Sequence, residues 1–244
     1  SGTAFNIYYA NIETLRPALY NSTPVPDVRR RYGDRDPAAK EGADAIERCI
    51  SYSIDDYDFD GTVKEAIDDL SITGRGVARV TYRADMVPLE IRDEQTGEPV
   101  MDVGAQTVSC ETVPWASFRR GPARMWAGVP WVAFAHYMTR DDLVALNPEV
   151  GKVVPLNMSV SEGGEKTNDG ANADNPESDV FKRALVWEIW DKAKRKVYFI
   201  AESYKVAPVT ELDDPLGLRD FFPVPAPMMS GKVSGRLVPL SPYK

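Results

Sequence analysis

The chain has 244 residues, a net charge of −8 and 43% hydrophobic residues. A chain of this length and composition can fill an ordinary hydrophobic core, which excludes a disordered protein. No apolar run is long enough for a transmembrane helix, and the first residues, SGTAFNIYYANIETLRPALY, lack the basic and apolar regions of a signal peptide. We therefore expect a soluble globular protein that is not exported and has no membrane partner.

The cysteine and histidine content is low. The only cysteines are Cys49 and Cys110, which are far apart in the sequence, and His136 is the only histidine. Zinc sites and disulfide frameworks need more of these residues at closer spacing. The sequence therefore predicts neither of them and fits a reducing compartment.

Charge is distributed unevenly along the chain. Residues 161–180 carry six acidic residues and one lysine, whereas residues 113–140 carry four arginines and no acidic residue. The net charge therefore does not describe the individual surfaces of the protein.

Residues 1–73 are predicted to be mainly helical. Apolar residues at helical spacing predict a first helix that ends near Tyr20 and contains Pro17. Its apolar face comprises Phe5, Tyr8, Ile12, Leu15 and Leu19. Prolines disfavour helix in PVPDVRRRYG, so residues 24–33 are expected to be extended.

Two further helices follow in this region. Asp36 as an N-cap and Pro37 at the first helical position predict the start of the second helix. The side chains expected to point inward from it are Ala39, Ala43, Ile46, Ile50, Ile54 and Tyr57. Thr62 and Glu65 resemble a capping box, which predicts a third helix that ends near Ile72.

Residues 74–212 are predicted to be mainly β-structure. Alternating apolar and polar residues predict strands at 76–83, 107–113, 131–138, 184–191 and 196–204, the last two forming a hairpin around KAKR. Two extended arms are expected around a turn at Thr96-Gly97. Thr139 and Asp142 predict the capped start of a short helix.

Two segments have unusual composition. Residues 157–180 have almost no large apolar side chain, so we expect a mobile acidic surface loop. Residues 213–244 are spaced by prolines and are expected to form an extended tail, either a surface strap or a connection. The whole chain is predicted to be one α+β domain, residues 1–244, with N-terminal helices packed on a mostly antiparallel β-sheet.

The stretch DYDFDGTVKEAI resembles a calcium-binding loop. Asp56, Asp58, Asp60 and Gly61 match positions 1, 3, 5 and 6 of an EF-hand. The twelfth position, which needs a bidentate Glu, is Ile67, and the ninth is a lysine. We therefore predict a helix boundary here and no metal site, with calcium binding as the alternative.

No stretch of the sequence combines the parts of an active site. The glycines of GRG at 74–76 precede a strand, whereas a phosphate-binding loop follows one. His136 alternates with Phe134 and Met138, which is typical of a packed histidine. Asp213-Asp214 precede a proline in a turn sequence, and neighbouring carboxylates point apart. The sequence therefore predicts no catalytic residue, no cofactor and no enzyme.

Residues 115–132, WASFRRGPARMWAGVPWV, combine three tryptophans with three arginines. Arginine binds phosphate and tryptophan stacks on bases, which would suit nucleic acid. The strand pattern that begins at Trp131, and the proline before Trp115, favour packing of the tryptophans instead. Interfaces between proteins are enriched in arginine. The candidate subunit-interface residues are therefore Arg119, Arg120 and Arg124.

Four stretches in order resemble the first half of tailed-phage portal proteins of podovirus type, which are head-to-tail connectors. They begin at NIYYANIETLRPALYNSTPVPDVRRRYGDRDP, PWASFRRGPARMW, VWEIWDKAKRKVYFIAESY and DDPLGLRDFFPVPAP, and only residues 157–180 lie outside the resemblance. Phe118, Arg119, Pro122, Ala123, Arg124, Trp126 and Trp131 match the family's wing-region motif, and Trp187, Trp190, Asp191, Val197 and Tyr198 match its hairpin. Trp115 is expected to be structural with them.

The resemblance implies a wing-like fold and a structural virion protein, made in the host cytoplasm and placed at one capsid vertex. Such subunits form a dodecameric ring on which terminase, capsid and tail adaptor proteins dock. DNA passes through its channel during packaging and ejection without sequence-specific binding. The stem and clip of such portals follow a segment like PLSPYK, so this chain is expected to correspond to the wing.

Two functional hypotheses remain beside each other. In a ring, the arginine-rich flank and an acidic flank are expected to meet as heterologous partners. The alternative is a nucleic-acid-binding module that uses residues 115–132, with an affinity that falls as salt rises.

Overall fold

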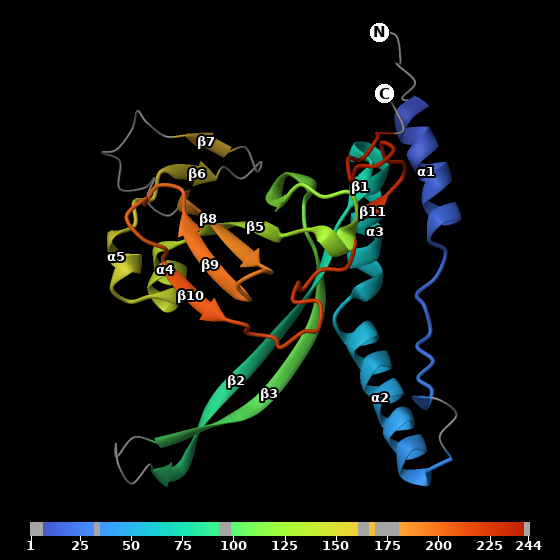
Figure 1. Cartoon of the computed structure of the whole chain (residues 1–244), viewed down its shortest axis with the longest axis horizontal. Helices are drawn as coiled ribbons and strands as arrows, with labels where there is room; N and C mark the ends of the chain where they lie inside the picture. Colours follow the sequence, from blue (N-terminus) through green and yellow to red (C-terminus); the bar gives the residue numbers. More distant parts are fainter. Residues whose placement is uncertain (1–6, 32–34, 93–98, 161–165, 169–180, 242–244) are drawn as a thin grey trace. The chain divides into compact units, whose positions relative to one another are not determined.

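The computed structural model describes residues 7–31, 35–92, 99–160, 166–168 and 181–241. Its contacts divide the chain into two compact units (Figure 1). Unit 1 comprises Ser1–Val113, Pro223–Gly231 and Pro239–Lys244, and unit 2 comprises Pro114–Phe222 and Lys232–Val238. The predicted α+β class is confirmed, with N-terminal helices packing against antiparallel strands. A single wing-type domain stays a prediction.

The helices of unit 1 are α1 (Ile7–Leu19), α2 (Pro37–Asp56) and α3 (Phe59–Thr73). The predicted cap of α2 is confirmed, because the Asp36 carboxylate accepts a hydrogen bond from the Ala38 backbone N–H at 3.0 Å. Arg16 of α1 donates from Nε to the Asp68 carboxylate of α3 at 2.9 Å. This ion pair ties the first helix to the third.

The prediction that Thr62 caps α3 is wrong. Asp58 is the N-cap, in a left-handed conformation with φ 48°, and its carboxylate accepts from the Gly61 N–H at 3.1 Å. The Thr62 hydroxyl instead donates to the Cys110 carbonyl at 3.0 Å, and the Thr112 hydroxyl donates to the Thr62 carbonyl at 2.9 Å. The Thr62 hydroxyl, which the sequence pattern assigned to the helix cap, therefore bonds to the strand β3 instead.

The inward face predicted for α2 is only partly covered. Ala39, Ala43, Ile54 and Tyr57 are half-buried, and no residue of the helix is fully buried. Ile46 is 53% exposed and Ile50 is 40% exposed. The third helix supplies the buried face of this unit through Ala66, Ile67 and Leu70. It contacts β1, β2 and β3, whereas α2 contacts the strands less (Figure 1).

The strands of unit 1 are β1 (Arg75–Gly76), β2 (Ala78–Arg92), β3 (Pro99–Thr112) and β11 (Met228–Met229). The strands predicted at 76–83 and 107–113 and the two extended arms join into one long antiparallel ribbon of β2 and β3. The Thr96-Gly97 turn lies outside the described residues. The short strands β1 and β11 pair, and a Cβ on Gly76 would lie 2.1 Å from the Ala66 carbonyl oxygen, so only glycine fits there.

Unit 2 is built on an antiparallel sheet with the strand order β10-β9-β8-β5-β4. These strands are β4 (Phe118–Arg120), β5 (Trp131–Met138), β8 (Lys182–Asp191), β9 (Lys196–Ala201) and β10 (Thr210–Asp213). The predicted β8–β9 hairpin is confirmed. Two short helices, α4 (Arg140–Leu146) and α5 (Val150–Val153), supply Leu143 and Val154 to a core cluster with Val186 and Val209.

The segment predicted as a loop at 157–180 is partly strand. It contains β6 (Met158–Val160) and β7 (Lys166–Asn168), which pair with each other. The first of them also pairs with Arg183 and Lys182 of β8, because that strand extends beyond its other neighbours and offers free backbone groups. Residues 161–165 and 169–180 lie outside the described residues.

The proline-spaced tail contributes to both cores as well as crossing the surface. The prediction of an extended tail is only partly correct, because turns and bends interrupt its backbone and β11 is the one strand wholly within it among the described residues. Four of its residues are buried: Phe221, Phe222, Val224 and Leu237. Across the part of the chain that the structure describes, no helix has the length and apolarity that crossing a membrane requires.

Candidate functional site

The Trp/Arg block at 115–132 lies wholly in unit 2. It contains the short helical turns η2 (Trp115–Ser117) and η3 (Trp126–Gly128), and β4 between them. The block folds back on itself because β4 pairs with β5, and the Gly121 N–H donates to the Trp131 carbonyl at 2.9 Å. A Cβ on Gly121 would lie 2.5 Å from Pro130 Cγ, so glycine permits this close return of the chain.

The aromatic residues of the predicted structural motif occupy different environments. Phe118 is fully buried against Phe134, with ring centroids 5.7 Å apart. Trp190 is also buried, and its ring centroid lies 5.3 Å from that of Phe221. Trp126 is half-buried and meets Phe222 edge to face at 5.9 Å. These side chains pack, as a structural role requires.

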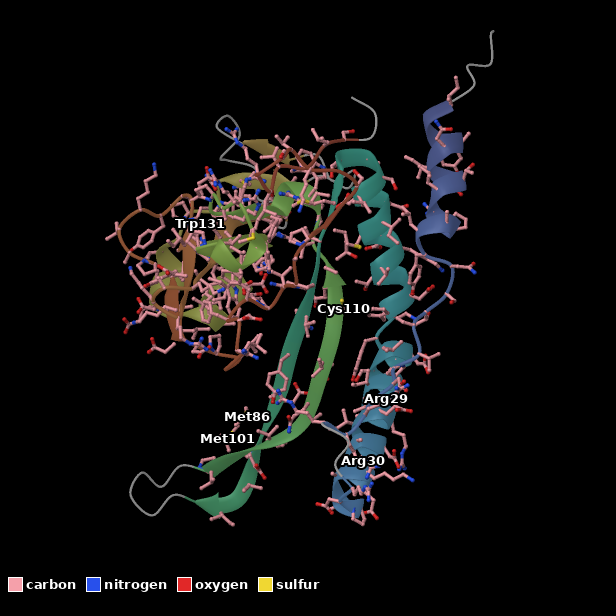
Figure 2. The ribbon with its side chains drawn as sticks, turned by 45° about the vertical axis from the view of Figure 1, so that its right-hand side comes forward. Arg29, Arg30, Met86, Met101, Cys110 and Trp131 are labelled. Carbon is pink, nitrogen blue, oxygen red and sulfur yellow. The ribbon has the colours of Figure 1, made fainter. Side chains whose placement is uncertain are left out.

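Two tryptophans and the proline of the motif lie at the surface instead. Trp115 is 51% exposed, and Trp131, labelled in Figure 2, is 36% exposed. Pro122 is also exposed. The prediction that Trp131 packs is wrong because it lies at the exposed first position of β5. The next three residues, Val132, Ala133 and Phe134, are all buried, so both faces of the strand are covered there.

The three candidate interface arginines do not act as one group. Arg119 lies over the Trp187 ring at 5.6 Å, and its Nη1 donates to the Ala116 carbonyl at 2.9 Å. Arg120 is half-buried, and it donates to the carbonyls of Gly121 and Leu237. Arg119 and Arg120 therefore have partners within their own unit.

Burial lowers the pKa of Arg120 from its ordinary value, because an apolar environment disfavours the charged form. The Nε of Arg120 is buried and has no hydrogen-bond partner among the described residues. Arg124, by contrast, is exposed, and no hydrogen bond or ion pair of its side chain is found in the described part of the chain. Arg120 is thus a half-buried group with one unpaired hydrogen-bond donor, and Arg124 is a surface cation.

A cavity of about 610 Å³ lies beside these arginines in unit 2. Arg120, Arg124 and Arg236 line it, and no acidic side chain does. The remaining lining residues are small or apolar: Pro122, Ala123, Ser234, Gly235, Leu237 and Val238. The cavity therefore joins two segments that are more than a hundred residues apart in sequence, and it is basic.

Arg236 was not predicted from the sequence as part of a site. It lies on a tight turn in which the Arg236 N–H donates to the Val233 carbonyl at 3.0 Å and the Val233 N–H donates to the Val238 carbonyl at 3.1 Å. Gly235 in this turn has φ 70°, a conformation that favours glycine. The dipeptide Ser234-Gly235 is a turn signal, but no local pattern indicates which distant loop the turn meets.

A buried polar cluster was missed as well. The Glu188 carboxylate lies 2.6 Å from His136 Nε2 and accepts a hydrogen bond from the Trp190 indole N–H at 2.8 Å. His136 was predicted to be packed with a satisfied proton, and its partner is this carboxylate. Glu188 lies on the buried face of β8, between Val186 and Trp190. A period-two pattern would place this acidic residue on the exposed face, so the sequence did not indicate an acid in the core.

The EF-hand-like aspartates have other partners. Asp58 caps α3, as described above, and Asp60 forms an ion pair with Lys64 at 2.5 Å. The Lys64 ammonium lowers the pKa of Asp60 through their hydrogen bond. In the ranges that the structure describes, no three Cys, His, Asp or Glu side chains gather where they could hold a metal ion.

The other motifs considered for chemistry are parts of turns and caps. Gly74 ends α3 in a left-handed conformation with φ 82°. Asp214 accepts a hydrogen bond from Arg195 Nε at 2.9 Å, and Asp213 lies 3.2 Å from the Lys196 ammonium. The two neighbouring aspartates thus bind different cations, as expected for carboxylates that point apart.

Comparison of the sequence with protein-family models and with curated proteins gives no match.

Proposed function

We propose that the chain is the wing part of a portal subunit, a structural virion protein that assembles into a ring at a capsid vertex. The proposal begins from the sequence resemblance, whose most specific parts are residues 118–143 and 188–202. These two stretches supply paired strands of one sheet, β5 and β8, so the resembling segments belong to one structural element. No catalytic role is part of the proposal.

The observation that carries the proposal is the exposed apolar surface of the β2–β3 ribbon. An isolated two-stranded ribbon is marginally stable in water, and exposed apolar patches mark interaction sites. The large apolar side chains that are at least about two-fifths exposed on it are Val80, Tyr82, Met86, Val87, Leu89, Ile91, Val100, Met101, Val103 and Val108. If the ribbon is buried against neighbouring subunits in a ring, the exposure of these apolar side chains in the single chain is explained.

Electron microscopy and mass photometry of the protein encoded by the complete gene test the proposal. The expected particles are closed rings of about twelve subunits with an axial channel. Monomers at every concentration up to tens of micromolar would contradict it. Terminase and tail adaptor proteins are the partners that such a ring would recruit.

A ribbon variant tests the surface that carries the proposal. Met86→Glu combined with Met101→Glu places two charges on neighbouring strands of the ribbon (Figure 2), and it should abolish ring formation. Lys205→Glu, an exposed change of the same total charge in unit 2, is the matched control and should leave the rings intact. Rings that form equally well with both would rule out the ribbon as the subunit contact.

Exposure of Trp115 and Trp131 favours a second candidate, a nucleic-acid-binding module that uses residues 115–132. Exposed indoles can stack on bases. This function predicts binding of single-stranded DNA that weakens steeply with salt and is lost in a Trp115→Ala, Trp131→Ala variant. Fluorescence anisotropy with a labelled oligonucleotide distinguishes it from the ring subunit, for which no such loss is expected.

A further inference from the structure

The arginine-lined cavity of unit 2 contains a concentration of positive charge, and no acidic side chain is among its lining residues. Arg120, Arg124 and Arg236 line it, in a chain whose net charge is −8. Like charges in one cavity repel each other, and the repulsion is relieved when an anion enters. The arrangement therefore favours an anionic ligand.

The side chains of two of these arginines are available to such a ligand. Arg124 and Arg236 are exposed, and in the described part of the chain neither side chain has a hydrogen bond or an ion pair. The third, Arg120, uses two of its donors on the carbonyls of Gly121 and Leu237 but leaves its Nε without a partner. The guanidinium fork matches a carboxylate or a phosphate through two parallel hydrogen bonds.

The backbone on both sides of the cavity is fixed by hydrogen bonds, which sets where the arginines start but leaves the exposed side chains of Arg124 and Arg236 free to adjust. On one side, Gly121 is bonded to Trp131 and its close contact with Pro130 fixes the return of the chain. On the other side, the turn with Gly235 at φ 70° carries Arg236. Arg120 joins the two sides through its hydrogen bond to Leu237. A backbone that is already ordered loses less entropy when a ligand binds.

The rest of the lining favours a peptide over a nucleic acid. No aromatic ring lines the cavity, so a base would find no stacking surface there. Three arginines are few for a polyanion that binds through many phosphates. Pro122, Ala123, Leu237 and Val238 instead offer apolar surface to the small side chains of a peptide. A volume of about 610 Å³ also exceeds what a single phosphate fills.

We infer that this cavity is a binding site for an acidic peptide segment, whose carboxylates pair with Arg124 and Arg236. The inference does not depend on the proposed ring function. The chain itself contains a segment of the right chemistry, because residues 161–180 carry six acidic residues and one lysine among small and polar residues. That segment is the probe of choice.

The test is a titration of a fluorescein-labelled peptide of residues 161–180 with the whole chain, followed by anisotropy. Because the chain contains the same segment, the titration is repeated on a variant in which Glu162, Glu165, Asp169, Asp174, Glu177 and Asp179 are replaced by Gln or Asn. We expect saturable binding that weakens as salt rises from about 50 to 500 mM. The variant with the neutral segment should bind at least as tightly as the natural chain.

Charge reversal at the site should remove this binding. Arg124→Glu combined with Arg236→Glu is expected to weaken it more than about tenfold, and replacement of both by Lys about threefold, because Lys keeps the charge but loses the fork. Arg219→Glu, an exposed arginine of the same unit outside the cavity, is the control and should change affinity by less than about twofold. Thermal unfolding of each variant verifies that it folds.

Three results would overturn the inference. One is no saturable binding to either form of the chain up to about 1 mM peptide, a millimolar Kd being too weak for a specific site. Another is binding that the Arg124 and Arg236 variant retains. The third is tighter binding of pyrophosphate or duplex DNA through the same arginines, which would make the cavity a phosphate site. None of these results bears on ring formation, so the two proposals fail separately.

Discussion

The sheet of unit 2 and the β2–β3 ribbon of unit 1 use similar apolar residues but bury them to different extents. In the sheet, Val132, Phe134 and Val186 are almost completely buried. On the ribbon, Met86 and Met101 are each about half exposed (Figure 2). Alternation of apolar and polar residues predicts a strand in both places, but it does not tell whether anything covers the apolar face.

The difference follows from what each strand pair has to pack against. The sheet of unit 2 is covered by Leu143 of α4, by Val154 and by Phe221 of the tail. In the described residues, hydrogen bonds join the ribbon to α3 near the end of β3, where Thr62 bonds to Cys110 and Thr112. Changes in the two regions should therefore differ in their effect on the free energy of unfolding.

The largest effect is expected from Phe221→Ala. Phe221 is fully buried, packs on Trp190 and lies under the Arg195 guanidinium at 5.4 Å, so truncation leaves a cavity in the core of unit 2. The expected loss of unfolding free energy is about 3–5 kcal/mol. All the tryptophans lie in unit 2, so urea unfolding followed by tryptophan fluorescence measures this unit.

Leu218→Ala is the control for this truncation, because Leu218 is close in sequence but 39% exposed. It should cost less than about 1 kcal/mol. Equal losses in the two variants would mean that the tail does not belong to the core of unit 2.

A smaller effect is expected at the start of α4, the helix that covers the sheet. Its capping box is complete, because the Asp142 carboxylate accepts from the Thr139 backbone N–H at 2.9 Å and the Asp142 N–H donates to the Thr139 hydroxyl. The carboxylate also accepts a hydrogen bond from the Thr139 hydroxyl at 2.7 Å, and this bond, together with the one from the Thr139 N–H, lowers the pKa of Asp142. Asp142→Asn should therefore reduce stability at neutral pH, by about 0.5–1 kcal/mol.

The pH dependence has a defined sign. A carboxyl whose pKa is lowered in the folded state stabilises the fold above its unfolded pKa of about 4, and the contribution is lost as pH falls through the folded pKa. The difference between the natural chain and Asp142→Asn should thus shrink below about pH 4. Asp141→Asn, a neighbouring change in the first turn, is the control. A difference that stays constant down to pH 2 would contradict the role of the Asp142 carboxylate.

Local signals explain which elements were predictable. The capping box of Thr139 and Asp142 and the hairpin around KAKR are set by residues within a few positions of each other, and both are confirmed. The cap of α3 was mispredicted because the Thr62 hydroxyl binds Cys110, which is 48 residues away. A single sequence does not display contacts at that separation.

The candidate site was less predictable than the fold for the same reason. Arg120 and Arg124 were singled out by composition, but Arg236 joins them only through a turn that is distant in sequence. Glu188 was not identified because one of its partners, His136, lies on another strand, β5, and the other, Trp190, is the next inward-facing residue of β8. Period-two patterning identifies the strands, while the pairing of a buried charge depends on the register between them.

The smallest effect on stability is expected on the ribbon. Met86→Glu combined with Met101→Glu should change the unfolding free energy of the monomeric chain by less than about 0.5 kcal/mol, because both side chains are already in contact with water. Far-UV circular dichroism during urea unfolding measures it, since the ribbon contains no tryptophan. Ile67→Glu, at a buried position of the same unit, is the counterpart and should cost several times more. If the ribbon variant costs as much as Ile67→Glu, the ribbon is packed in the monomer, and its apolar surface cannot be what a ring would bury.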